Sequence, residues 1–183
     1  MPKIEDKFSH EVERQISVTP SLDFPAKHSS VPIKTHEEGI VVIREVPVYG
    51  PALVDEKLCS KYVRMAARDM FGKFYAKTHA WNRRYDDRLV TEVEGRSLKE
   101  LANMEILLPG MIIGIENPSS SMINEIDKQG NKALYTHNAL YIGRNRNGEP
   151  LFAEQFVFPI IIRTESNMSS DNLRAVEILD SRS

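Results

Sequence analysis

The side chains in this chain that could carry out covalent chemistry are its one cysteine, Cys59, and one of its five histidines, His137. A thiol becomes a nucleophile when it loses its proton, and a helix N-terminus or a nearby imidazolium stabilises the resulting anion. Cys59 lies near the start of a segment with helical character, and His137 lies at the start of a segment with strand character. If the fold brings the two together, they form a thiol nucleophile and its base.

The segment that carries the cysteine is predicted to be a helix. Residues 55–71 contain neither Gly nor Pro, Asp55 is a suitable N-cap, and Gly72 follows as a stop signal. Side chains spaced at helical intervals place an apolar face on it, made of Cys59, Val63, Ala66 and Met70. This pattern predicts that the thiol lies in the opening turns of a partly buried helix. A buried, unreactive cysteine is the alternative interpretation.

The segment that carries the histidine is predicted to be a strand in a hairpin. Residues 136–142 alternate in a way that puts three side chains on one face, namely His137, Ala139 and Tyr141. The Asn147-Gly148 pair is typical of a tight turn, and residues 151–158 return as the partner strand. We expect the His137 face to pack against the cysteine helix. The alternative is a half-exposed histidine at a strand end.

The partner strand of the hairpin supplies candidates for the third member of a catalytic group. A base histidine needs an acceptor for its second ring nitrogen. Glu154 and Gln155 both lie in the returning strand, and either could reach His137. A solvated strand edge is the alternative interpretation for each of them.

The remaining sequence predicts a small α+β domain. The predicted order is a strand at residues 40–46, the cysteine helix, a short helix from Ser97 with Glu100 at the capping-box position, and an antiparallel meander. We expect five to six strands, with the helices packed on one side of the sheet. Residues 1–38, interrupted by prolines, are predicted to form an irregular arm, and residues 39–183 a single domain. Residues 117–132 and 166–172 are predicted to be loops.

Composition and charge exclude several classes of function. The chain has 183 residues and a net charge of −2, which argues against a nucleic-acid partner. No apolar run is long enough to span a membrane, and the N-terminus lacks a signal-peptide pattern, so we expect synthesis in the cytoplasm unless a leader has been removed or another export route is used. One cysteine cannot build a multi-thiolate zinc site, and the histidines lack metal-ligand spacing. We therefore expect no cofactor.

Three blocks of the sequence resemble the NlpC-type cysteine peptidases and the related CHAP amidases. They are residues 58–64 (LCSKYVR), residues 107–113 (LLPGMII), and residues 136–143 (THNALYIG) followed by 151–155 (LFAEQ). The blocks occur in the order typical of the family and together cover about residues 49–158. The third block is the most specific, because it is similar to the family's Thr-His hairpin.

The resemblance implies a papain-like fold and hydrolysis of an amide bond through an acyl-enzyme, with a cell-wall peptide as the usual substrate. Cys59 would be the nucleophile and His137 the base, and Glu154 best matches the third position. Tyr49 is similar to the aromatic residue that precedes the nucleophile. Trp81, the only tryptophan, could line the cleft or pack in the core, and Gln155 could contact substrate.

The chain departs from the family pattern near the nucleophile. Lys61 stands where a Gly commonly follows Cys-Ser, Leu58 replaces an Asp, and Met111 replaces the Asp after Pro-Gly. These departures bear on the substrate more than on the fold. They leave a second interpretation, a catalytically inactive module that holds a peptide or a protein partner in the same groove. A structural protein whose arm swaps onto a neighbour is a third.

Overall fold

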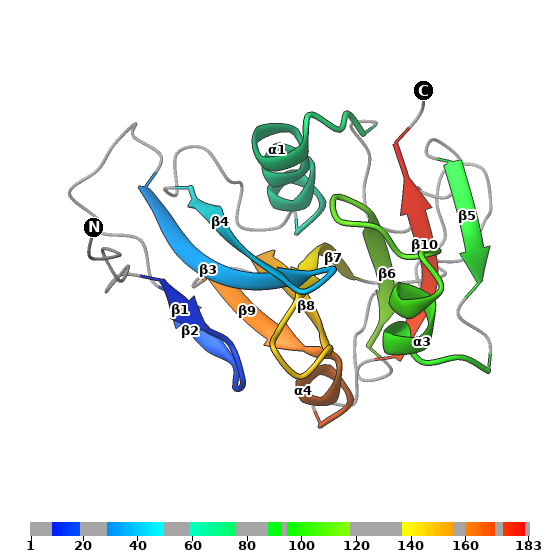
Figure 1. Ribbon diagram of the computed structural model, residues 1–183. Coiled ribbons are helices and arrows are strands. Elements are labelled where there is room, and N and C mark those ends of the chain that lie inside the picture. The colour runs from blue at the N-terminus through cyan, green and yellow to red at the C-terminus, as the bar shows by residue number, and fades with distance from the viewer. Residues whose placement is uncertain are drawn as a thin grey trace, which may run out of the picture.

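The fold is seen in a computed structural model that describes residues 9–18, 29–49, 59–75, 88–92, 95–117, 137–155, 160–170 and 174–181. The described elements are β1 His10–Glu11, β2 Ile16–Val18, β3 Ser29–Glu37, β4 Ile40–Val48, α1 Cys59–Phe71, β5 Arg88–Glu92, α3 Leu98–Asn103, β6 Ile112–Glu116, β7 His137–Arg144, β8 Pro150–Gln155, β9 Ile160–Thr164, α4 Glu165–Ser170 and β10 Arg174–Asp180. Strands and helices are mixed along the chain, so the fold is α+β as predicted (Figure 1).

The strands form two sheets. The larger has seven described strands in the order β2-β9-β8-β7-β6-β10-β5, and every neighbouring pair in it is antiparallel. The smaller has the order β1-β3-β4, with β1 parallel to β3. The larger sheet exceeds the predicted five to six strands because β2 and β5 extend its two edges. The predicted meander holds from β6 to β9, whereas β10 returns to lie between β6 and β5.

Helix α1 forms because its sequence offers one continuous buried stripe. The buried side chains recur at the spacing of one helix face, namely Cys59, Tyr62, Val63, Ala66 and Ala67. The helix ends at Gly72, whose φ of +66° suits the residue after a C-cap and whose N–H donates to the Arg68 carbonyl across 2.9 Å. The predicted stop is therefore confirmed. The predicted cap at Asp55 lies outside the described residues.

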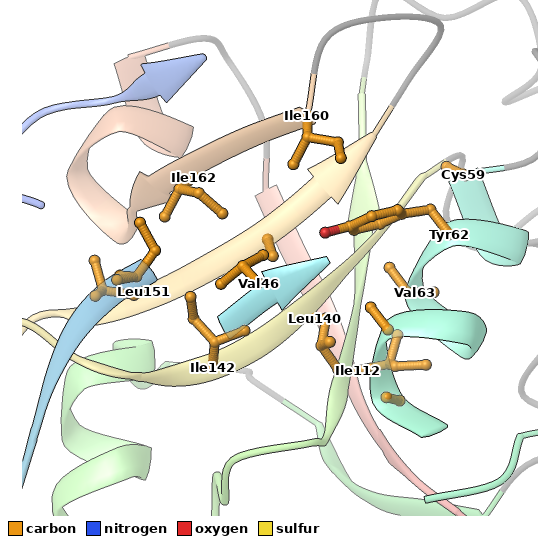
Figure 2. Close-up of a cluster of buried hydrophobic side chains, with 14 of the residues drawn as sticks. Val46, Cys59, Tyr62, Val63, Ile112, Leu140, Ile142, Leu151, Ile160 and Ile162 are labelled. Carbon is orange, nitrogen blue, oxygen red and sulfur yellow. The ribbon is translucent and has the colours of Figure 1, made fainter. Parts of the chain in front are cut away.

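The two faces of the larger sheet carry two separate hydrophobic clusters. Leu140 and Ile142 of β7 pack in the cluster that contains α1 (Figure 2), whereas Ala139 and Tyr141 pack in the cluster that contains α3 and Met168 of α4. Because successive strand residues point to opposite faces, α1 covers one face and the shorter helices cover the other. The prediction that the helices lie on one side of the sheet was wrong. The alternation cannot reveal which helix covers which face.

The predicted capping box at the start of α3 is confirmed. The Glu100 N–H donates to the Ser97 hydroxyl across 3.1 Å, and the Ser97 N–H donates to Glu100 Oε2 across 2.8 Å. Glu165, the first residue of α4, also accepts hydrogen bonds from the Leu98 and Lys99 N–H groups at 2.7 and 3.0 Å. The two short helices are therefore tied together at their ends.

The prediction of an irregular arm over residues 1–38 was wrong for β3, which is a nine-residue strand paired with β4 along its whole length. Pro32 was interpreted as a breaker, but it lies at a position where only β4 is paired with β3, since β1 contacts Ile33 and Lys34. Ile33 and Thr35 are buried, which is the alternation of a strand. Part of the predicted arm is thus built into the domain.

Two further segments differ from their predictions. The start of residues 166–172, predicted as a loop, lies in helix α4, which begins at Glu165. Residues 88–92, which were not among the predicted elements, form β5 and are paired with β10. In both cases tertiary contacts decide the conformation where local propensity is weak.

Gly110, which precedes β6, packs against the residues at and just after the end of α1. We expect its replacement to destabilise the fold. Its φ is +92°, and an added Cβ would lie 3.0 Å from Phe71 Cβ and 2.9 Å from Lys73 Cδ. Gly110→Ala should lower the free energy of unfolding by about 1–3 kcal/mol, measured by chemical denaturation. Gly148→Ala is the matched control, because its φ is +75° but the nearest atom lies 3.8 Å away. Equal losses in the two variants would show that the packing of Gly110 contributes nothing.

Candidate functional site

Cys59 is the first described residue of α1, and its thiol is set to carry negative charge. Its sulfur accepts hydrogen bonds from the backbone N–H groups of Ser60 and Asn138 and interacts with the His137 side chain. The residue is only 8% exposed. A sulfur at a helix N-terminus with two backbone donors is placed as a thiolate, which is the nucleophilic form of cysteine.

His137 links the thiol to a carboxylate. It is the first residue of β7, and its Nε2 donates to Oε2 of Glu154 across 2.6 Å. Because Nε2 is engaged with Glu154, Nδ1 is the ring nitrogen that faces the thiol side of the pair. The two residues predicted to act as nucleophile and base therefore interact in the structure, and Glu154 supplies the orienting acceptor.

The site is assembled differently from the way the sequence suggested. The face of β7 that packs against α1 carries Leu140. The other face carries Ala139, which by strand alternation is the face predicted for His137. His137 reaches the thiol because it is the first residue of its strand, and the first residue of α1 lies at this same end of the sheet. Figure 2 shows Cys59 at the end of α1, at the margin of the buried cluster. The juxtaposition arises at the strand end rather than across the packed face.

The charges in this group support one another. Burial raises the pKa of the Cys59 thiol, but the His137 imidazolium and the backbone donors outweigh burial, so the net pKa is lowered from the ordinary value of 9.0. Burial lowers the pKa of His137, but the Cys59 and Glu154 anions outweigh it and raise the pKa to about 10. The two shifts therefore both favour the state in which Cys59 is a thiolate and His137 an imidazolium.

Arg163 of β9 is a fourth member that the sequence did not predict. Its Nε forms an ion pair with Glu154 Oε1, so the two oxygens of the carboxylate serve different partners. The side chains of Arg163 and Glu154 are 6% and 2% exposed. Burial raises the pKa of Glu154, but His137 and Arg163 hold it below its usual range. A single arginine directly after three isoleucines was the available signal, since a buried charge must be paired.

Two buried carboxamides lie next to His137 and Glu154 in the sequence. Asn138 is 0% and Gln155 is 2% exposed, and none of their side-chain N and O atoms has a hydrogen-bond partner within the described structure. Asn138 follows His137, and Gln155 follows Glu154. Gln155 is therefore close in sequence to the site, but the oxygen that accepts from His137 belongs to Glu154. Of the two candidates for the third position, Glu154 is the one whose contact with His137 is seen.

The structure does not direct Tyr49 towards the thiol. The Tyr49 side chain is fully buried, and its hydroxyl donates to Asp69 Oδ2 across 2.6 Å. Asp69 lies ten residues after Cys59 in α1, which is about 15 Å along the helix axis. The Tyr49 ring also packs edge-on against Tyr62 of α1, three residues from Cys59, with 5.8 Å between ring centroids. A substrate contact of Tyr49 stays a prediction. Trp81 lies outside the described residues.

The described residues contain no group of three or more His, Cys, Asp or Glu side chains that could hold a metal ion. No helix among them is both long and apolar enough to cross a bilayer. No protein-family model, curated protein or solved structure matches this chain. What the site can do is therefore inferred from its own geometry and charge.

Proposed function

We propose that this protein is a cysteine hydrolase, an amidase or endopeptidase, that cleaves amide bonds through an acyl-enzyme on Cys59. The observation that carries the proposal is the buried series of side chains from the Cys59 thiol through His137 to Glu154 at the N-terminus of α1. This arrangement has each part that thiol catalysis requires: a stabilised thiolate, an adjacent imidazole, and a group that orients the imidazole.

The reaction follows from the positions of these groups. The Cys59 thiolate attacks the carbonyl carbon, and the His137 imidazolium gives its proton to the amine as the C–N bond breaks. Water then attacks the thioester and gives a proton to the neutral imidazole of His137, and the thiolate leaves. Backbone N–H groups in the first turn of a helix have no partner inside the helix, so the Cys59 N–H would stabilise the oxyanion.

The fold and the substrate are part of the same proposal. The cysteine on a helix, the histidine at the start of the next hairpin and the third residue on its returning strand occur in the order of the NlpC-type peptidases, which have a papain-like fold. Through this resemblance we propose a peptide of the bacterial cell wall, or a similar polymer, as substrate. Because the chain departs from the family pattern at Leu58, Lys61 and Met111, we propose that the amide bond it cleaves differs from the one typical of the family.

The pH dependence of hydrolysis tests the proposal. The active form has Cys59 ionised and His137 protonated, so it exists above the lowered pKa of the thiol and below about 10. We expect kcat/KM for release of new amino groups from purified peptidoglycan to stay level through neutral pH and to fall as the pH rises through about 10. An acidic limb at the ordinary thiol value of 9.0 would contradict the proposed ion pair.

An inactive binding module is the second candidate, and the burial of the thiol favours it. Cys59 is only 8% exposed, so its sulfur presents little surface to a substrate. If the protein is a binding module, peptidoglycan will bind equally to the wild type and to Cys59→Ala, and neither protein will release amino groups from it. If the protein is a hydrolase, only the wild type will release amino groups from peptidoglycan.

A further inference from the structure

Arg163 and Glu154 are joined in a way that sets the charge of the whole site. In the β8–β9 ladder Glu154 lies opposite Ile161 and Phe152 lies opposite Arg163, so Glu154 and Arg163 are diagonal neighbours on one face. Their ion pair is buried, and the other oxygen of Glu154 accepts from His137. The site therefore contains four groups in series, and each is almost completely removed from water.

Charge counting shows what the arginine contributes. While His137 is protonated and Arg163 is present, the thiolate form holds two negative and two positive groups and has a net charge of zero, whereas the neutral thiol would leave a net charge of +1. Without Arg163, the thiolate form would carry a net charge of −1, whereas the neutral thiol with an intact His137–Glu154 pair would be balanced. Because an unbalanced charge is costly in a buried site, the arginine decides which form of Cys59 is favoured.

We propose that Arg163 is a positioning residue that makes the thiolate the charge-balanced form of Cys59, acting through Glu154 and His137. The proposal rests on the proposed function, since it concerns the same nucleophile. Arg163 pairs with the Glu154 carboxylate and acts through it. It neutralises the Glu154 carboxylate, which in turn stabilises the His137 imidazolium beside the thiolate.

The same balance serves the second half of the reaction. When Cys59 becomes a thioester, its negative charge is lost and the imidazolium proton has left with the amine. The remaining Glu154–Arg163 pair is neutral, so His137 is balanced as a neutral imidazole and can accept a proton from water. Without Arg163, the Glu154 carboxylate alone would favour the imidazolium in the acyl-enzyme, and the base would be lost.

Three described side chains act on the charges of Cys59 and Glu154, namely His137, Arg163 and Tyr62. Tyr62 of α1 faces Glu154, but burial first and then the carboxylate raise its pKa far above the usual range, so it stays neutral. Its hydroxyl donates to the Pro47 carbonyl across 3.2 Å. The groups acting on Glu154 are His137 of β7 and Arg163 of β9, and those acting on Cys59 are His137 and backbone N–H groups.

Titration of the thiolate by its absorbance near 240 nm, with Cys59→Ala as the blank, tests the proposal without any substrate. We expect Arg163→Met to move the inflection upwards by about one to two pH units, while Arg163→Lys keeps it near the wild-type position. The double variant Arg163→Met with Glu154→Gln removes both charges of the pair. We expect it to return the inflection towards the wild type, because the thiolate–imidazolium pair is then balanced again.

If Arg163 has only a structural role, the inflection of the double variant will be displaced as far as that of Arg163→Met, and that result would overturn the proposal. An inflection that does not move in Arg163→Met would overturn it as well. If circular dichroism shows that Arg163→Met is unfolded, the double variant and Arg163→Lys decide the matter. A double variant displaced upwards by more than about one pH unit would then overturn it. If the titrations behave as expected but no peptide is cleaved, the hydrolase fails and the role of Arg163 stands.

Discussion

Cys59→Ala will abolish hydrolysis while leaving the fold intact. The variant removes the only nucleophile in the site, and we expect the rate to fall by about four to six orders of magnitude. Its cost in stability should be about 1 kcal/mol, because the sulfur is small and the helix keeps its other buried contacts. The measurement is release of new amino groups from peptidoglycan, together with the denaturation midpoint.

Cys59→Ser is the matched variant, since it keeps the shape and changes only the acidity of the nucleophile. A hydroxyl is not ionised near neutral pH, so Cys59→Ser should be nearly as inactive as Cys59→Ala. Undiminished turnover in either variant would exclude the thiol mechanism. Because the chain has one cysteine, no other thiol can substitute for the missing one.

His137→Ala is expected to have the second largest effect. It removes the imidazolium that outweighs burial at Cys59, so the pKa of the thiol should rise above its ordinary value. It also removes the general acid for the leaving amine, and we expect kcat/KM to fall by at least about four orders of magnitude. Steady-state rates and thiol alkylation at neutral pH measure the two consequences separately.

His36→Ala is the control for this substitution. His36 also pairs with a carboxylate, Glu11 Oε1, at 3.2 Å, but it faces no thiol. We expect His36→Ala to leave both the turnover and the alkylation rate unchanged. If His137→Ala alters neither quantity more than His36→Ala does, the assignment of His137 as base is wrong.

The parts of the site that could be predicted from the sequence are those encoded by local patterns. A helix face, a stop glycine, a capping box and a turn signal are each contained in a short stretch, and the structure has all four. The pairing of Cys59 with His137 was a hypothesis about tertiary structure, supported by the family resemblance rather than by either segment alone.

The parts that could not be predicted depend on contacts between distant segments. Arg163 follows three isoleucines, and only the register between β8 and β9 places it beside Glu154. The contacts of Tyr49 with the Asp69 carboxylate and the Tyr62 ring likewise depend on how α1 packs on the end of β4. The proline in β3 was misleading because it is tolerated where a neighbouring strand is missing.

The pH dependence of alkylation of Cys59 by iodoacetamide tests the central claim most directly, because the reagent reacts with the thiolate and the chain has one cysteine. The interaction with His137 lowers the pKa of Cys59, so the alkylation rate should reach its plateau at a pH below the ordinary thiol value of 9.0. An alkylation rate that rises only near the ordinary thiol value of 9.0 would show that the thiol and the imidazole do not form an ion pair.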